Sequence, residues 1–270
     1  MGDGMEISAG SDMRIGVLGA LRIARAVAGV GVLLMLAGLW AVLPERWRLR
    51  RRLASMAFAA VRAGFGLSIR AYGTPLVGAD VLYAANHVSW TDIVVLACLT
   101  DAGFVAKHEV RSWPVIGALA ARYGCIFVDR ERRGAAGMQA SAVAERLRGK
   151  RAGRQGIVLF PEGTTGDGTA LLPFRSSLFE GAGAGDEGSG SARIQPVTLR
   201  YRRRDGSALS PAELRCIAWI GDDELLPHAL GLAVRGGAMA EVWFEAPLPP
   251  GSRKELAAGS RAVIAARLAD

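Results

Sequence analysis

The sequence predicts an α/β protein: a mixed, substantially parallel sheet flanked by helices, with an N-terminal membrane-associated helical segment before it. Short extended apolar runs recur along residues 67–244, and helical runs separate several of them. Alternation of strands and helices is typical of layered α/β folds in which most strands are parallel. An uncharged apolar run near the N-terminus, Ala26–Leu43, predicts the membrane-associated segment.

Each expected element follows from a local pattern of apolar residues. The expected strands are Leu67–Tyr72, Val81–Ala85, Gly103–Ala106, Cys125–Val128, Ile157–Phe160, Ile194–Leu199 and Val242–Phe244. The expected helices are Trp90–Leu99, Val115–Tyr123, Ala135–Leu147 and an amphipathic C-terminal helix over Arg253–Leu268. Pro196, at the start of a strand, indicates a sheet edge or an entrance, because proline cannot donate a hydrogen bond to a neighbouring strand.

Residues 1–66 are expected to form a disordered N-terminus and membrane-associated helices, and residues 67–270 a single α/β domain. Ala26–Leu43 holds 18 residues without a charge, and at about 1.5 Å per residue they make about 27 Å of helix. That length is at the lower limit for crossing a bilayer, so the run either crosses it or dips back out; a buried core helix is the alternative. Apolar residues at helical spacing over residues 49–61 predict a second, amphipathic helix at the interface.

Arginine dominates the charge of the chain, which has a net charge of +8 and a pI of about 10.1. Five arginines lie in Arg46–Arg52, directly after the uncharged run. Because the more basic flank of an apolar helix stays on the cytoplasmic side, we expect a cell-membrane protein whose folded domain faces the cytoplasm and whose Arg46–Arg52 cluster binds membrane lipids. A basic nucleic-acid-binding protein is the non-enzymatic alternative. It is less favoured, and no nucleic acid is expected as a partner, because the arginines cluster next to an apolar helix, which favours membrane docking.

A histidine and an aspartate follow the strand Val81–Ala85 in the stretch from Asn86 to Asp92. If His87 lies in the turn before a helix and Asp92 in its first turn, with Ser89 as the N-cap, their side chains can meet. Asp92 then accepts a hydrogen bond from one imidazole nitrogen and fixes the tautomer, so the other nitrogen can take a proton from a hydroxyl. The alternative is a capped helix with a turn histidine of no catalytic role.

Two further blocks follow strands. The loop 161–168 carries glycines and hydroxyl groups that can direct backbone N–H groups at an anion, although alone it is also typical of a flexible loop. Arg130 follows the strand Cys125–Val128, where a solvated charge is the alternative. The three cysteines are widely spaced and form no metal-binding pattern, so we expect no bound metal.

Taken in order, these blocks resemble those of the glycerolipid acyltransferase family, most closely the 1-acyl-sn-glycerol-3-phosphate acyltransferases. The family carries N-H-x4-D, an arginine block ending F-x-x-R, F-P-E-G-T, and a block with a central proline. Here they read Asn86-His87…Asp92, Phe127-Val128-Asp129-Arg130, Phe160-Pro161-Glu162-Gly163-Thr164-Thr165 and Gln195-Pro196-Val197. The segment from Ala106 to Gly117 is also similar to the family's stretch between its first two blocks.

The resemblance implies transfer of an acyl group from acyl-CoA or acyl carrier protein to the hydroxyl of a lysophospholipid, with no bound cofactor or metal. It implies that lysophosphatidic acid is converted to phosphatidic acid in phospholipid biosynthesis. His87 would be the general base and Asp92 its orienting carboxylate. Because a thioester is already an activated acyl donor, no covalent intermediate on the protein is needed.

For the acceptor, the resemblance implies that Arg130 binds the phosphate and that Glu162 and Gly163 belong to the acceptor-binding block. Further expected contacts to the acceptor or its phosphate come from Thr164, Thr165 and Lys107. Glu162 is expected to orient Arg130 or to accept from a glycerol hydroxyl, and backbone N–H groups near Ser89 or Gly163 to stabilise the oxyanion.

Two alternative enzymes remain open. The first is an O-acyltransferase of the same chemistry that acts on lyso-ornithine lipid or another lysolipid. The second is a hydrolase that uses Cys98 or Cys125 with His87, which is less favoured because neither cysteine lies where a thiolate would be activated.

Overall fold

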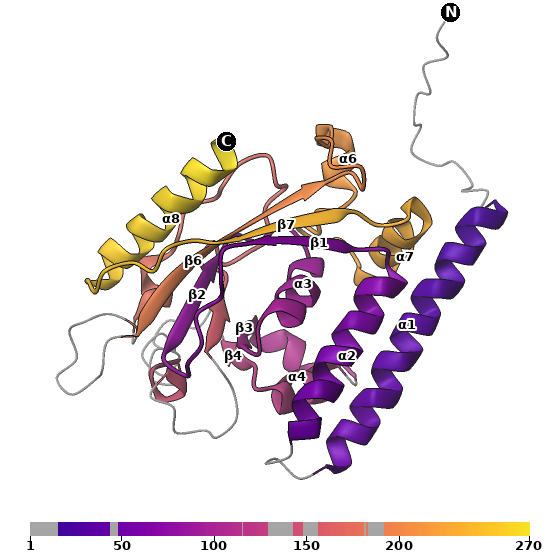
Figure 1. Ribbon diagram of the computed structural model, residues 1–270, viewed down its shortest axis with the longest axis horizontal. Coiled ribbons are helices and arrows are strands. Elements are labelled where there is room, and N and C mark those ends of the chain that lie inside the picture. The colour runs from indigo at the N-terminus through magenta and orange to yellow at the C-terminus, as the bar shows by residue number, and fades with distance from the viewer. Residues whose placement is uncertain are drawn as a thin grey trace, which may run out of the picture.

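The computed structural model describes residues 16–43, 48–114, 116–128, 143–147, 156–180, 182 and 192–270. Within these residues seven strands form one sheet in the order β1-β7-β6-β2-β5-β3-β4 (Figure 1). The strands are β1 Ser68–Tyr72, β2 Val81–Ala85, β3 Gly103–Lys107, β4 Ile126–Val128, β5 Ile157–Leu159, β6 Arg193–Arg202 and β7 Met239–Phe244. The mixed, mostly parallel sheet confirms the predicted fold class.

Strand direction determines where the ends of the strands meet. The pair β6–β7 is antiparallel and the other pairs are parallel. Therefore β6, β2, β5, β3 and β4 all end at one edge of the sheet. β2 is the central strand of the seven-stranded sheet and all five of its residues are buried, which explains its unbroken apolar sequence.

The described helices cover both faces of the sheet (Figure 1). They are α1 Val17–Val42, α2 Arg48–Gly64, α3 Thr91–Leu99, α4 Ile116–Tyr123, α6 Pro211–Arg215, α7 Leu225–Arg235 and α8 Arg253–Ala269, with the 3₁₀ helices η1 His108–Ser112 and η2 Ser176–Phe179. α8 and η2 pack on one face, whereas α3 packs on the other with α1, α2 and α7 beyond it. Alternate residues of β2 serve the two cores: Tyr83 faces α3, and Leu82 faces α8.

α1 begins earlier than predicted. It starts at Val17, so Arg22 and Arg25 lie inside the helix and not before it. Their guanidinium groups are held by the ends of other helices: Arg22 Nη1 donates to Val234 O at 2.8 Å, and Arg25 Nε donates to Gly64 O at 3.0 Å. Carbonyl groups at a helix C-terminus attract cations, so these contacts make charged residues tolerable within an apolar helix.

α1 and α2 pack closely against each other. A side chain at Gly29 would place its Cβ 2.6 Å from Ala60 O, so the two backbones approach too closely for any residue but glycine there. Further along, Leu36, Trp40 and Leu53 form a small separate core between the two helices. The predicted division into residues 1–66 and 67–270 stays a prediction.

The observed position of Pro196 in the sheet differs from the predicted one. The prediction of an edge at Pro196 is wrong, because β6 lies between β7 and β2. Pro196 O accepts from Glu245 N, one residue beyond the end of β7. The proline nitrogen faces the same side, where the pairing of β6 with β7 has ended, so the lack of an N–H group leaves no strand hydrogen bond unmade. The predicted helix Ala135–Leu147 lies outside the described residues except for 143–147, which are helical.

Candidate active site

His87 and Asp92 meet as the sequence predicts. His87 follows the end of β2, and Asp92 lies in the first turn of α3. His87 Nδ1 is 2.8 Å from Asp92 Oδ2. The Asp92 side chain is fully buried, whereas that of His87 is 15% exposed. The carboxylate therefore fixes the imidazole from inside the protein and leaves its other nitrogen toward the surface.

The local turn explains why Asp92 is held so firmly. Its Oδ2 also accepts from the backbone N–H groups of Val88 and Ser89, at 2.7 and 2.9 Å. The predicted N-cap is displaced by one residue: Trp90, not Ser89, is the N-cap of α3. The carboxylate nevertheless supplies half of a capping box, since it accepts from an N–H three residues before it.

Tyr201 completes the surroundings of Asp92 and was not found from the sequence. It lies in β6, its side chain is buried, and its hydroxyl donates to Asp92 Oδ1 at 2.5 Å. Thr91 Oγ1 is 2.7 Å from the same hydroxyl. Burial raises the pKa of Tyr201 well above its ordinary value, so the hydroxyl stays protonated and remains a donor. One feature of the sequence could have indicated its role: a tyrosine within an apolar strand is expected to be buried, and a buried hydroxyl needs a hydrogen-bond partner.

Tyr201→Phe is expected to lower kcat for acyl transfer. Without the Tyr201 hydroxyl, Asp92 Oδ1 loses the donor that Tyr201 supplies, so the carboxylate is held less firmly in the position from which it contacts the imidazole. We also expect stability to fall by about 1.5–3 kcal/mol, because a hydrogen bond to a charged group is lost. The control is Tyr83→Phe, which removes a buried hydroxyl that donates to Leu76 O, away from the site. An equal loss of kcat in both variants would contradict this role of Tyr201.

Glu162 supports the same turn from the next strand. It follows β5 and is buried, with Oε1 accepting from His87 N–H at 2.7 Å and Oε2 from Leu172 N–H at 2.9 Å. Burial raises the pKa of Glu162 to about 7, and the nearby Asp92 adds to that rise, while the two N–H donors oppose it. Both carboxylate oxygens are thus used on the backbone of the site.

Phe160 and Gly163 flank Glu162. The Phe160 ring stacks on the His87 imidazole, with centroids 3.8 Å apart and planes 12° apart, which restricts rotation of the imidazole. Gly163 has φ +77°, a backbone conformation that favours glycine, and a Cβ there would lie 3.0 Å from Arg175 Nε. The exposed Arg175 guanidinium therefore lies across the turn that contains Glu162.

The other predicted site residues are distributed as follows. Thr164 is exposed, and Thr165 Oγ1 donates to Trp219 O. Trp219 N–H donates to Val88 O at 3.0 Å, so this residue from outside the four blocks joins the first block to the third. Lys107 is the last residue of β3, and its side chain lies outside the described structure, as does Arg130.

The two backbone groups suggested for the oxyanion already have acceptors. Ser89 N–H donates to Asp92 Oδ2, and Gly163 N–H donates to Phe160 O at 3.1 Å. Neither of these two groups is free to bind an oxyanion in this arrangement. The expectation of oxyanion donors near Ser89 or Gly163 stays a prediction for the neighbouring N–H groups.

Cys98 does not fit the hydrolase alternative. It lies near the C-terminal end of α3, about 10 Å of helix from the end that carries Asp92. Burial raises the pKa of its thiol, which disfavours the nucleophilic thiolate. Within the described residues, no group of three or more His, Cys, Asp or Glu side chains could hold a metal ion.

The chain is similar to several known acyltransferases. The family model described as Acyltransferase matches residues 68–200. The lyso-ornithine lipid O-acyltransferase of Brucella abortus is 40% identical over 201 residues, 74% of this chain and 74% of that protein. The protein of the same description from Pseudomonas aeruginosa is 37% identical over 80% of this chain and 79% of its own length.

A second group of relatives matches a shorter region. The 1-acyl-sn-glycerol-3-phosphate acyltransferase of Neisseria gonorrhoeae is 40% identical over 127 residues, 47% of this chain and 46% of that protein. Among solved structures, the crystal structure of the 1-acyl-sn-glycerophosphate (LPA) acyltransferase PlsC from Thermotoga maritima covers 95% of both chains. Its TM-score is 0.61 and its sequence identity 18%, which establishes a shared fold.

Proposed function

Because this chain belongs to the lysolipid acyltransferase family, we propose that it transfers a fatty acyl group from acyl-CoA or acyl carrier protein to the free hydroxyl of a membrane lysolipid. The observation that carries the proposal is the buried Asp92 carboxylate, 2.8 Å from Nδ1 of a partly exposed His87. This is the geometry required of a general base with a fixed tautomer.

The proposed reaction is a direct transfer. His87 Nε2 removes the proton of the lysolipid hydroxyl as its oxygen attacks the thioester carbonyl carbon. The tetrahedral intermediate then expels the thiolate, and the proton on the imidazole passes to the leaving sulfur. Asp92 stabilises the imidazolium that forms between these steps, while Phe160 and Glu162 hold the ring and the backbone of His87.

We propose lyso-ornithine lipid as the acceptor, with lysophosphatidic acid as the second candidate. The supporting observation is coverage: relatives named for lyso-ornithine lipid match 74% and 80% of this chain, whereas the relative named for 1-acyl-sn-glycerol-3-phosphate matches 47%. With either acceptor, Arg130 is the proposed partner of the anionic group, the carboxylate of lyso-ornithine lipid or the phosphate of lysophosphatidic acid.

The test is an acyl-transfer assay on purified protein with both acceptors and both donors. We expect a higher kcat/KM for lyso-ornithine lipid, and a loss of about 10²- to 10⁴-fold in His87→Ala, as for removal of a general base. Arg130→Ala should raise the KM for the acceptor and leave that for the donor little changed. Preference for lysophosphatidic acid would select the second candidate, and no transfer to either would reject the proposal.

We infer that α1 lies along one side of the membrane and does not cross it. By length and composition α1 could span a bilayer, with a mean hydropathy of 1.9 over its most apolar 18 residues. Both of its ends, however, contact the α/β domain: Arg22 donates to Val234 O in α7, and Arg122, in α4, donates to Ala41 O. A helix lying along the domain in this way favours in-plane insertion on the cytoplasmic side.

A further inference from the structure

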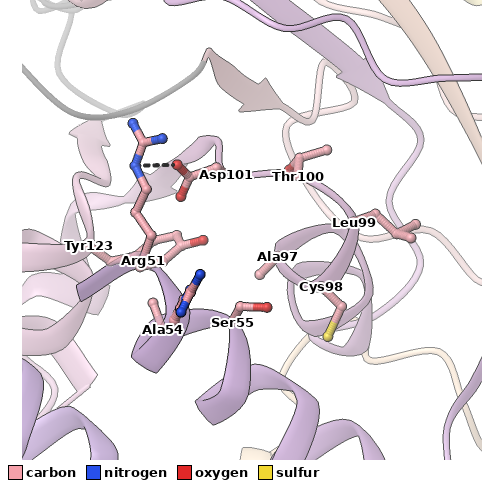
Figure 2. Close-up of a pocket in the computed structure, with 10 residues that line it drawn as sticks. Arg51, Ala54, Ser55, Ala97, Cys98, Leu99, Thr100, Asp101 and Tyr123 are labelled. Atoms are coloured by element: carbon pink, nitrogen blue, oxygen red, sulfur yellow. Dashed lines mark ion pairs between the residues drawn. The ribbon is translucent and has the colours of Figure 1, made fainter. Parts of the chain in front are cut away.

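A pocket of about 310 Å³ lies at the end of α3 opposite the candidate active site (Figure 2). One wall is α2, which contributes Arg51, Arg52 and Ser55. The other wall is the end of α3 and the residues after it, including Asp101. Because about 10 Å of helix separates this end of α3 from Asp92, the pocket is distinct from the acyl-transfer site.

The pocket carries one positive charge in excess. Arg51 Nε lies 3.0 Å from Asp101 Oδ2, so these two charges are matched (Figure 2). Arg52 is exposed and has no ion-pair partner among the residues that the structure describes. Ser55, one turn further along α2, adds a hydroxyl donor on the same wall. A guanidinium group and a hydroxyl group together suit the oxygens of a phosphate.

The surroundings of Arg52 favour a lipid over a soluble anion. Leu49 and Met56 are 42% and 56% exposed. Residues 49, 52 and 56 are three and four positions apart, so they lie along one face of α2. An exposed cation between two exposed apolar side chains is the pattern of a group that binds a headgroup while its neighbours contact acyl chains.

A third side of the pocket, formed by α4, lies next to the end of α1. Tyr123 lines the pocket, and the preceding residue, Arg122, donates to Ala41 O near the end of α1. The next residue of α1, Val42, is 79% exposed. Of the predicted docking cluster Arg46–Arg52, by contrast, Arg50 is buried and lies 4.1 Å over the Trp40 ring, so it is not available to lipid.

We propose that this pocket binds the headgroup phosphate of one anionic membrane phospholipid, with Arg52 and Ser55 as its ligands and the acyl chains beside Leu49 and Met56. This proposal rests on one part of the proposed function, that the protein acts on a lipid at the membrane surface. It differs from general attraction to an anionic surface because it requires a pocket of defined shape as well as a charge.

The test is binding of the full-length protein to phosphatidylcholine vesicles with and without phosphatidylglycerol, in the absence of acyl donor. Arg52→Ala should weaken binding to the anionic vesicles about fivefold, as for loss of one cation near the surface. Ser55→Tyr, which fills the pocket without changing charge, should weaken it similarly. The control, Arg204→Ala, removes an exposed arginine from the loop after β6 and should bind as wild type does. Thermal melting verifies that each variant is folded.

Three outcomes would overturn the proposal. Equal losses in Arg52→Ala and Arg204→Ala, with none in Ser55→Tyr, would indicate general electrostatic attraction. Competition by inorganic phosphate as effective as that by a short-chain phosphatidylglycerol would assign the pocket to free phosphate. Wild-type binding in both pocket variants would exclude any role for the pocket. Because vesicle binding is measured without acyl transfer, failure here is distinguishable from failure of the proposed enzymatic activity.

Discussion

Asp92→Asn is expected to lower kcat for acyl transfer by about 10²- to 10⁴-fold, the range of a general base that loses its function. The carboxylate accepts from the imidazole, from two backbone N–H groups and from the Tyr201 hydroxyl. An amide has one oxygen and a donating NH₂ group, which must face at least one of these donors. The imidazole then loses both its fixed tautomer and the charge that stabilises its protonated form.

The measurement is kcat per mole of folded protein, with the folded fraction taken from thermal unfolding. We expect Asp92→Asn to cost about 1–3 kcal/mol of stability as well, because a buried donor is left without an acceptor. Asp80→Asn is the matched control, since it makes the same aspartate-to-asparagine change in an exposed ion pair with Arg193. An Asp92→Asn enzyme that keeps more than about a tenth of wild-type kcat would refute the role of Asp92, since general-base catalysis accounts for at least 10²-fold.

Glu162→Gln is expected to change how the free energy of unfolding depends on pH. Burial raises the pKa of Glu162 from 4.5 to about 7, so between these values the folded protein binds a proton that the unfolded chain does not. Wild-type stability therefore falls as the pH rises from about 4.5 to 7, by up to about 3 kcal/mol from this group. Glutamine does not titrate, so the stability difference between wild type and variant should be largest near pH 5 and smallest near pH 8.

The same substitution should slow the reaction, because glutamine can accept only one of the N–H groups of His87 and Leu172. Urea unfolding at several pH values gives the stability difference. Glu255→Gln is a control of opposite sign: backbone and side-chain hydrogen bonds from Ser252 lower the pKa of Glu255, so wild type loses its advantage as the pH falls through that lowered pKa. A difference for Glu162→Gln that stays constant from pH 5 to pH 8 would contradict the prediction.

Patterns among residues close together in the sequence were sufficient to predict the strands of the sheet and the pairing of His87 with Asp92. All seven predicted strands are present. The apolar runs of the inner strands β2 and β5 are buried on both faces of the sheet, which explains why they are unbroken. His87 and Asp92 are five residues apart across a strand-to-helix turn, so local geometry alone allowed them to be placed together.

Contacts between distant parts of the chain could not be predicted in this way. α1 extends beyond the uncharged run on which its prediction rested, because Arg22 and Arg25 are held by carbonyl groups at the ends of α7 and α2, which are distant in the sequence. Residue types also did not reveal that turn geometry directs Ser89 N–H and Gly163 N–H at acceptors inside the protein.

The sequence by itself determined the strand–helix alternation, the apolar N-terminal helix and the pairing of a histidine with a nearby carboxylate, since each depends on residues close together in the chain. Only the tertiary structure decided what surrounds that pair. Tyr201 reaches Asp92 across 109 residues, and Glu162 reaches His87 across 75. These contacts exist because β6 and β5 flank β2 in the sheet, and the order of strands is set by the packing of the whole domain.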